Sequence, residues 1–307
     1  MSVLATMFSG ITFQNPIVLA SGTAAYGREL HDIVDLERLG GLVTKAVSLL
    51  PRPGARAPRV AEFPGGMINA IGLANPGVEV VRESELPWLA ANLRRARVLV
   101  NVVGSSVDDF AEVITRLDDP AGVSGYELNV SCPNVKAGGL EFGADRDVLR
   151  VLVERARAAT AKPVVVKLSP TLADIAGTAQ VAQDAGADAI TLTNTVPGLV
   201  IDTRTRRPRI GFGSGGMSGP PLLPIGVLAT WRASRAVTIP VIGLGGVSRG
   251  DHALQYIMAG ATLVGVGTAG MVDPRAPERI VQELERWCVR AGVSSLASLR
   301  GTLEWPS

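Results

Sequence analysis

The sequence predicts an α/β fold: a (β/α)8 TIM barrel with insertions on its top face. Short runs rich in Val, Ile and Leu alternate with helical stretches along the chain, and this order produces a parallel sheet. Eight such runs occur in 307 residues, and eight strand-then-helix units need roughly 250. The runs are apolar throughout, as in strands that are buried on both faces.

The expected strands are residues 17–20, 42–45, 98–102, 125–129, 164–168, 189–193, 241–244 and 263–266. Helices are expected over 145–160, 173–185 and 276–291, with Asp145 and Ser248 placed like N-caps. The surplus length falls in 46–97 and 194–240, which are too long for simple crossovers. Both stretches follow strand ends, so both insertions belong on the top face, where such barrels keep their active sites.

The competing fold, a doubly wound open sheet, usually opens with a GxGxxG turn after its first strand. No such turn follows 17–20, and the nearest match, 243–248, comes after the seventh run. In a barrel, that place is typical of a phosphate-binding loop. The sequence therefore favours the barrel, and one domain spanning 1–307.

Composition excludes several classes of function. A net charge of +2 lacks the dense basic footprint of nucleic-acid binding. Every apolar run is interrupted well short of the roughly 20 residues of a membrane span, and the first residues lack the pattern of a signal peptide. Two cysteines, Cys132 and Cys288, supply neither a disulfide framework nor the four thiolates of an iron–sulfur or structural zinc site. We expect a cytoplasmic protein that binds neither nucleic acid nor metal.

Nearly every expected strand ends in a polar residue or glycine. These residues are Ser21, Gly22, Lys45, Asn101, Asn129, Lys167, Thr193, Asn194, Gly243 to Gly246, Gly267 and Thr268. In a barrel they converge on one mouth, which suits a large, polar, anionic ligand. The glycine turns after the seventh and eighth strands place backbone N–H groups near helix N-termini, where a phosphate is favoured. Glycine can also end a strand for turn geometry alone.

Two lysines and one cysteine are the candidates for chemistry. Lys45 and Lys167 each end a strand, where a lysine serves as a Schiff-base nucleophile or as a fixed cation opposite an anion. Cys132 lies three residues beyond the fourth strand, among Asn129, Asn134 and Lys136, and could act as a nucleophile or as a general base.

The remaining candidates have simpler interpretations. Cys288, in the middle of a helix, is expected to be packing. His31 and His252 lie away from the strand ends, so surface or packing roles are favoured for both. The basic run 204–209 (RTRRPR) is expected to be a solvated loop, with a partner-docking surface as the alternative.

Taken together, these residues resemble the dihydroorotate dehydrogenase family, in particular the catalytic subunits of its class 1B. The resemblance runs essentially end to end. The matching stretches are ASGTAAYG (20–27), TKAVSLLPRPGARAPR (44–59), GGMINAIGLANPG (65–77), NVSCPNVKAGGLEFG (129–143), VVVKLSP (164–170), TNTVPGLVID (193–202) and GGMSGP (215–220), with VIGLGGV and VGVGTA beyond them.

The resemblance implies an FMN-containing barrel that oxidises dihydroorotate to orotate in pyrimidine biosynthesis. Carried over residue by residue, FMN would be held by Ser21, Lys45, Asn101, Asn129, Lys167, Thr193, Gly219, Gly245, Gly246, Gly267 and Thr268. The substrate would be held by Lys45, Asn69, Ala70, Ile71, Gly72, Leu73, Asn129, Asn194 and Thr195. Cys132 would be the catalytic base, with Lys45 and Lys167 as catalytic cations.

The loop at 132–139 indicates the class. The resemblance places a cysteine, Cys132, where the membrane-bound class has serine, and Val-Lys-Ala-Gly-Gly follows Cys-Pro-Asn as in class 1B. Class 1B passes electrons to NAD+ through a second subunit that carries FAD and an iron–sulfur cluster, so such a partner is implied. A homodimer inside a heterotetramer would follow.

Three alternatives remain. A related FMN enzyme could act on another dihydropyrimidine, although NAIGLANPG argues against it. A class 1A enzyme would use fumarate. Outside this family, a barrel lyase could use Lys167 as a Schiff base, and a non-catalytic scaffold is disfavoured because the polar strand ends are retained.

We expect the Cys132→Ala variant to slow reduction of the bound flavin by dihydroorotate about 10²-fold or more, the usual scale for the loss of a general base. Stopped-flow absorbance under anaerobic conditions measures this rate. An unchanged rate would remove Cys132 from the reaction.

Overall fold

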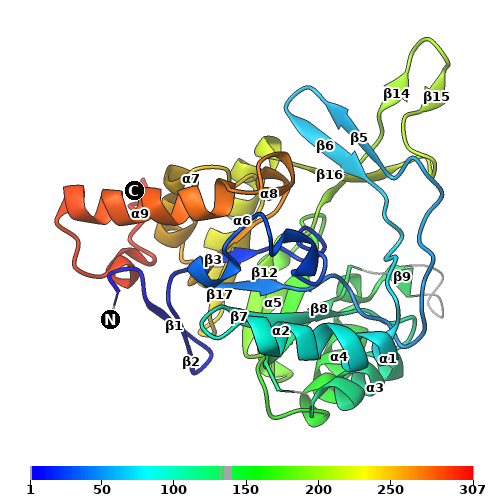
Figure 1. Cartoon of the computed structure of the whole chain (residues 1–307), viewed down its shortest axis with the longest axis horizontal. Coiled ribbons are helices and arrows are strands. Elements are labelled where there is room, and N and C mark those ends of the chain that lie inside the picture. Colours follow the sequence, from blue (N-terminus) through cyan, green and yellow to red (C-terminus); the bar gives the residue numbers. More distant parts are fainter. Residues whose placement is uncertain (1, 120, 132, 135–139, 307) are drawn as a thin grey trace.

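Eight parallel strands close into a barrel, which confirms the predicted fold class (Figure 1). Each strand pairs with the next along the chain, and β8 pairs with β11 to continue the circuit through β18 and β3. The barrel strands are β3 (Ile17–Leu19), β4 (Gly41–Val43), β7 (Arg97–Val102), β8 (Val123–Asn129), β11 (Val164–Leu168), β12 (Ala189–Leu192), β17 (Val241–Leu244) and β18 (Leu263–Val266). This computed structural model describes residues 2–119, 121–131, 133–134 and 140–306.

The predicted strands lie within two residues of the observed ones at either end, and three have the same bounds. The expected strand 42–45 ends early, at Val43. The reason is a change of hydrogen-bond partner: the Lys45 N–H donates to the Ala25 carbonyl at 2.7 Å, away from the barrel ladder. The chain thus leaves the sheet just before Lys45 and carries that side chain toward the top face.

Helices surround the barrel and cover the outer faces of the strands (Figure 1). They are α1 (Val78–Val80), α2 (Leu86–Asn92), α3 (Val107–Leu117), α4 (Arg146–Ala158), α5 (Ile175–Asp184), α6 (Leu223–Ser234), α7 (Gly250–Met258), α8 (Thr268–Val272) and α9 (Ala276–Ala291). A π-helical segment, Val81–Glu85, joins α1 to α2. Short 3-10 turns lie at Arg28–Leu30, Leu36–Arg38, Phe142–Ala144, Pro220–Leu222 and Leu296–Leu299.

Of the two expected N-caps, one is confirmed and one is wrong. The Asp145 side chain accepts hydrogen bonds from the N–H groups of Asp147 and Val148 and so begins α4. Ser248 does not cap α7, whose N-cap is Arg249 without a side-chain cap. The Ser248 hydroxyl instead lies 3.3 Å from Nδ1 of His252, which is in the first turn of α7. Cys288 is buried in α9 as packing, as expected, and burial together with the charge of Glu285 raises the pKa of its thiol.

The lower part of the barrel interior is a closed apolar layer. Alternate residues of a strand point to opposite faces, and the inward set here is Val18, Val43, Leu99, Val165, Ala189, Ile242 and Leu263. The hairpin of β1 (Thr6–Phe8) and β2 (Ile11–Phe13) adds Phe8 and Phe13 to this layer, with their rings edge to face at 5.7 Å. The barrel therefore opens only toward its other end.

The two expected insertions, 46–97 and 194–240, pair with each other. Strands β5 (Val60–Phe63) and β6 (Gly66–Asn69) of the first join β13 (Val196–Gly198) and β16 (Gly215–Ser218) of the second in one antiparallel sheet, ordered β13-β16-β6-β5. We call this sheet the roof, since residues of β6 and β16 line the pocket at the barrel mouth. Its register places Asn69 opposite Gly216 and Met67 opposite Ser218.

The basic run forms the tip of a hairpin that projects from the roof (Figure 1). Its strands are β14 (Ile201–Asp202) and β15 (Arg207–Pro208), and the residues from Thr203 to Arg209 are exposed, as expected for a solvated loop. Two further short strands, β9 (Pro133–Asn134) and β10 (Leu140–Glu141), pair after β8.

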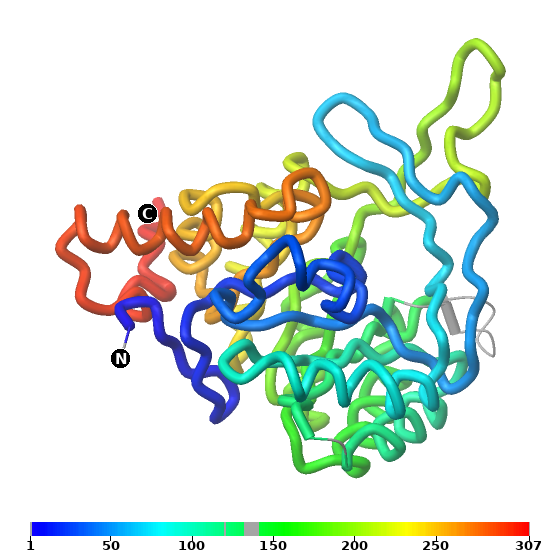
Figure 2. Tube along the Cα trace, in the orientation of Figure 1, coloured from blue at the N-terminus to red at the C-terminus, as the bar shows by residue number. Residues whose placement is uncertain are grey.

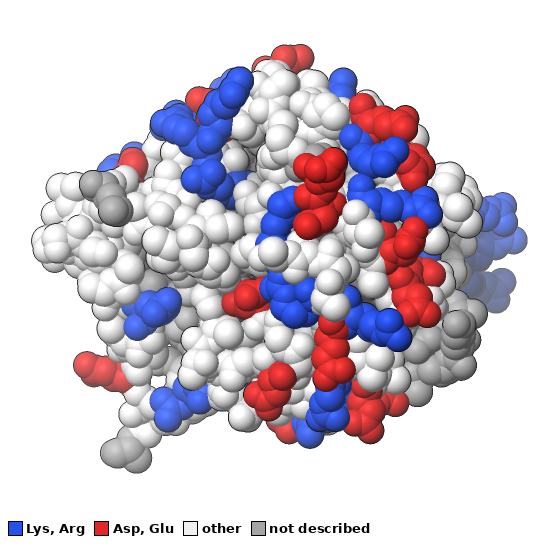
Figure 3. Space-filling view, turned by 90° about the horizontal axis from the view of Figure 1, so that it is seen from below, with Lys and Arg blue, Asp and Glu red and all other residues white. Residues whose placement is uncertain are grey.

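The two ends of the chain lie on the same side of the barrel (Figure 2). The Leu296 N–H donates to the Val3 carbonyl at 2.9 Å, which joins the C-terminal turn to the N-terminal segment. On the face seen in Figure 3, basic and acidic side chains are interspersed. Ion pairs such as Arg116 with Glu79 and with Glu112 are consistent with this mixing. Among the helices of the described residues, none is long and apolar enough to cross a membrane.

We expect the Phe13→Ala variant to lose about 3–5 kcal/mol of unfolding free energy, because a fully buried ring leaves a cavity in the lower layer. Urea unfolding measures the loss. The matched control is Met7→Ala on the same hairpin, where the side chain is 58% exposed and the expected change is within about 0.5 kcal/mol. Equal losses in the two variants would show that this hairpin does not seal the barrel.

Candidate active site

The polar strand ends converge on one pocket of about 520 Å³ at the barrel mouth. Every residue that the sequence assigned to FMN lines this pocket, and so do Asn69, Ile71, Leu73, Asn194 and Thr195. These residues come together because the carboxyl ends of all eight strands meet at one rim. The predicted convergence of the polar strand ends on one pocket is therefore confirmed, whereas the binding role of each residue stays a prediction.

Of the two lysines, Lys167 is buried on the pocket floor. The residue lies on β11 two positions after Val165, so its side chain points inward above the apolar layer. Only 5% of it is exposed, and its Nζ donates a hydrogen bond to Ser21 Oγ at 3.0 Å. Glu127 Oε1 lies 3.8 Å from the same nitrogen. Lys45, half-buried, reaches the pocket from the end of β4, which β7 and β8 separate from β11.

A group of amides lies beside the lysines. Asn129 ends β8, and its Oδ1 accepts a hydrogen bond from Asn194 Nδ2 at 3.1 Å. The backbone N–H of Asn194 donates to the Leu168 carbonyl, which fixes this turn against β11. From the roof, Asn69 Nδ2 donates to the Gly216 carbonyl at 3.2 Å. The pocket can thus offer donors and acceptors to the carbonyl, N–H and carboxylate groups of a small polar ligand.

The turn after β17 requires glycine and is held from below by a tyrosine. Gly245 and Gly246 have φ values of +128° and +70°, and a Cβ on Gly246 would lie 2.5 Å from the Leu223 nitrogen. Tyr256, buried in α7, donates its hydroxyl proton to the Gly245 carbonyl at 2.8 Å. Burial raises the pKa of Tyr256 well above its ordinary value, so this hydroxyl stays a donor.

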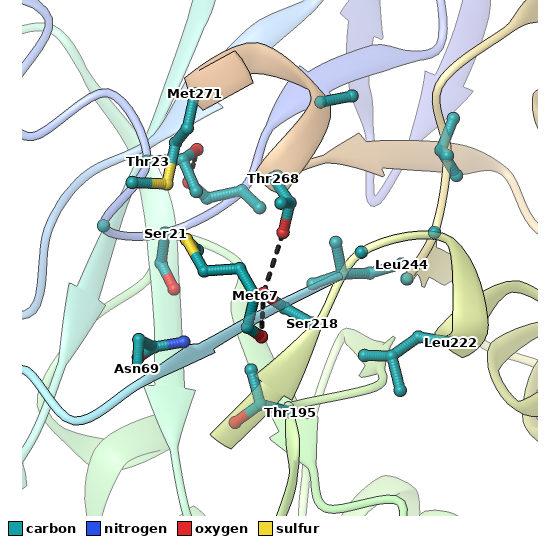
Figure 4. A pocket seen from close by; sticks show the side chains of 18 of the residues that line it. Ser21, Thr23, Met67, Asn69, Thr195, Ser218, Leu222, Leu244, Thr268 and Met271 are labelled. Carbon is teal, nitrogen blue, oxygen red and sulfur yellow. Dashed lines mark hydrogen bonds between the residues drawn. The ribbon is translucent and has the colours of Figure 1, made fainter. Parts of the chain in front are cut away.

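The second glycine turn connects the barrel to the roof. Gly267 is the N-cap residue of α8, and Thr268 Oγ1 donates to Ser218 Oγ of β16 at 2.9 Å. Figure 4 shows this bond together with Met67 and Asn69 of β6 across the pocket. At the far end of α8, Arg279 donates to Asp273 at 2.6 Å. This bond and the Arg275 N–H lower the pKa of Asp273.

The residues present fit a flat, anionic cofactor such as FMN. Among the described residues, the buried Thr193 Oγ1 and Asn101 Oδ1 have no hydrogen-bond partner, and buried polar atoms are normally paired. Both line the pocket, so a polar ligand can satisfy them. The lysines supply positive charge, the glycine turns permit close approach of a phosphate, and Leu222 and Leu244 supply apolar surface (Figure 4).

Two of the predicted site residues do not line the pocket and a third lies outside the described residues, and the binding or catalytic roles of all three stay predictions. Asn69, Ile71 and Leu73 line the pocket, whereas Ala70 and Gly72 do not. Gly72 lies in a turn at φ +68°, and its backbone packs against that of Ala55. The Ala70 N–H is also taken, since it donates to the Arg59 carbonyl at 2.8 Å. Cys132 lies outside the described residues, so its role stays a prediction.

Several lining residues were missed by sequence reasoning. They are Thr23, Met67, Ser218, Leu222, Leu244, Met271, Asp273 and Arg279. The roof residues among them carry no local signal, because only the pairing of two distant insertions brings them over the mouth. Glu127 and Thr191, beneath the pocket floor, could have been found from the sequence. Each lies two positions before a predicted site residue on the same expected strand, Asn129 or Thr193, and therefore points to the same side.

We expect the Tyr256→Phe variant to weaken FMN binding several-fold and to lose about 1–3 kcal/mol of stability, because the Gly245 carbonyl is left unpaired. Fluorescence titration of the apoprotein with FMN and urea unfolding measure the two effects. The matched control is Tyr126→Phe, a buried tyrosine whose hydroxyl donates to Asp118 away from the pocket. Unchanged FMN affinity in Tyr256→Phe would contradict the support of this turn by Tyr256.

The comparisons with known proteins agree with this architecture. The sequence profile of the family described as dihydroorotate dehydrogenase matches residues 3–287. A solved structure of dihydroorotate dehydrogenase from Eimeria tenella, in complex with ferulenol, superposes with a TM-score of 0.84. It covers 98% of this chain and 88% of the other at 23% identity, which supports the fold alone.

Two curated relatives are similar over nearly their whole length. The chain is 46% identical over 296 residues to the catalytic subunit of dihydroorotate dehydrogenase B (NAD(+)) from Pelobacter propionicus, covering 96% of this chain and 97% of the relative. It is 48% identical over 302 residues to a putative dihydroorotate dehydrogenase A (fumarate) from Solibacter usitatus, covering 98% and 99%. The barrel, its pocket and these matches together show that the chain belongs to the dihydroorotate dehydrogenase family.

Proposed function

We propose that this chain oxidises dihydroorotate to orotate with a bound FMN and passes the electrons to NAD+ through a partner subunit. The observation that carries the proposal is the pocket itself: in a member of this family, two lysines, four asparagine amides and two glycine turns surround one mouth. Residues 1–307 would act as a single FMN-binding barrel domain. The cytoplasmic location expected from the sequence stays a prediction.

The floor and the glycine-rich side of the pocket would hold FMN. The proposed residues are Ser21, Lys45, Asn101, Asn129, Lys167, Thr193, Gly219, Gly245, Gly246, Gly267 and Thr268. When bound, FMN supplies the acceptor for the hydride. Lys167 presents a fixed positive charge to a ligand that becomes more negative on reduction, and such a preorganised charge stabilises the developing anion.

The substrate would lie between the amides and the roof. Asn69, Asn129, Asn194 and Thr195 would hydrogen-bond its ring, with Ile71 and Leu73 beside them, and Lys45 would meet its carboxylate. The reaction removes a proton from C5 and a hydride from C6, which leaves a C5=C6 double bond. We assign the removal of the C5 proton to Cys132 as general base.

The electron acceptor separates two candidates. The names of relatives such as the Pelobacter propionicus and Geobacter metallireducens proteins, catalytic subunits of NAD(+)-linked dihydroorotate dehydrogenase B, support NAD+. The partner would then carry FAD and an iron–sulfur cluster, and the chain would form a homodimer inside a heterotetramer. The Solibacter usitatus relative, with its fumarate name, supports the second candidate, direct reduction of fumarate.

We expect anaerobic dihydroorotate to bleach the flavin absorbance of the purified protein, because the substrate reduces the bound FMN. Orotate is the matched control, since it fills the same site without donating electrons. Stronger bleaching by dihydrouracil would favour a related enzyme that acts on another dihydropyrimidine. Protein that purifies without flavin would contradict the proposal and favour a lyase that uses Lys167 as a Schiff base.

The reduced protein from this experiment also tests the acceptor. Adding NAD+ to this chain alone is expected to leave the flavin reduced, whereas NAD+ with the partner subunit restores its colour. Rapid reoxidation by fumarate without any partner would contradict the NAD+ assignment and support the second candidate.

A further inference from the structure

A carboxylate lies buried directly beneath the pocket. Glu127 is on β8, between the inward positions of Gly125 and Asn129, and only 1% of it is exposed. It does not line the pocket and takes no part in the chemistry proposed above. An ionised carboxylate inside a protein is costly unless it is paired and hydrogen-bonded. Glu127 therefore needs partners that offset the cost of burying its carboxylate.

Glu127 makes three contacts to barrel strands on either side of it. Oε1 accepts a hydrogen bond from Asn101 Nδ2 of β7 at 2.7 Å, and Oε2 accepts one from Thr191 Oγ1 of β12 at 2.9 Å. Lys167 Nζ of β11 lies 3.8 Å from Oε1, close enough for charge pairing but beyond hydrogen-bond distance. Glu127 thus offsets the positive charge of Lys167 without using one of its N–H donors.

The contact with Asn101 fixes the orientation of that amide. An ionised carboxylate only accepts hydrogen bonds, so the NH2 group of Asn101 must face Glu127 and Oδ1 must face elsewhere. Asn101 lines the pocket, and its Oδ1 is buried and has no hydrogen-bond partner among the described residues. The pocket consequently presents an acceptor at this point, and a ligand with an N–H or O–H group is favoured there.

We propose that Glu127 is a positioning residue that acts through Lys167 and Asn101. Its negative charge partly offsets the positive charge of Lys167, and its carboxylate orients the amide of Asn101. The inference rests on the proposed function only in taking the pocket ligand to be FMN. Removing the negative charge leaves the positive charge of Lys167 less offset, so the reduced, more negative flavin is stabilised relative to the oxidised one. The midpoint potential of the flavin should therefore rise.

The test is Glu127→Gln, which keeps the shape of the side chain but removes its charge. Its amide oxygen can still accept from Asn101, and the Thr191 hydroxyl can turn to accept from its NH2 group. Anaerobic dye-linked titration of the FMN-loaded protein should show at least a tenfold shift toward reduced flavin, which is about 30 mV for a two-electron couple. The matched control is Thr191→Val, which removes one hydrogen bond to Glu127 but leaves its charge, and should shift the equilibrium less than threefold. Equal shifts in both variants, or none in Glu127→Gln, would overturn the proposal.

A double variant tests whether the effect passes through Lys167. In a Lys167→Met background, Glu127→Gln should shift the flavin equilibrium less than threefold, because the charge that it moderated is gone. A full shift in that background would overturn the proposal. If Glu127→Gln alone does not fold, recovery of folding in Glu127→Gln/Lys167→Met supports the charge coupling, and failure of both contradicts it.

This experiment separates the inference from the proposed function. The titration uses a chemical reductant, so it reports on Glu127 even when dihydroorotate does not reduce the flavin, an outcome that would defeat only the proposed substrate. Protein that binds no FMN would overturn both.

Discussion

The site depends on the closure of eight parallel strands into a barrel whose side chains alternate inward and outward. Below, the inward positions are apolar, as with Val165 and Leu99; two residues further along the same strands they are Lys167 and Asn101. Because parallel pairing places Lys167 beside Asn129 on one side and Thr191 on the other, these groups meet without any long loop. Closure thus stacks a polar layer on an apolar one.

The polar layer has an energetic cost that the rest of the barrel offsets. A buried lysine and a buried glutamate both lose hydration, and their attraction repays this only with good geometry and further hydrogen bonds. Here Ser21, Asn101 and Thr191 supply those bonds. The apolar layer below, closed by Phe8 and Phe13, keeps water from entering the barrel from its other end. A sealed floor keeps the electrostatic interactions at the mouth strong.

The roof shows how the upper half of the site is assembled. An isolated two-stranded hairpin is marginally stable in water, whereas a sheet of more strands can persist. Each insertion supplies only part of the four-stranded sheet, and pairing of Asn69 with Gly216 joins the two. The bond from Thr268 to Ser218 then connects the roof to the barrel rim. Pocket residues of the roof and pocket residues of the barrel rim are therefore held by one continuous framework.

The barrel, the positions of its strands and the polar residues at their ends are all predictable from the amino-acid sequence. These features are local: a run such as 164–168, with the lysine inside it, is recognised from neighbouring residues alone. Which of these residues meet depends on the tertiary fold. Glu127 bonds to Asn101 and Thr191, which lie 26 and 64 positions away, and Ser248 binds His252 rather than capping its helix. Residues 70 and 72 do not line the pocket, although their neighbours do. Such outcomes depend on strand register and barrel closure, which bring together segments that are distant in the sequence.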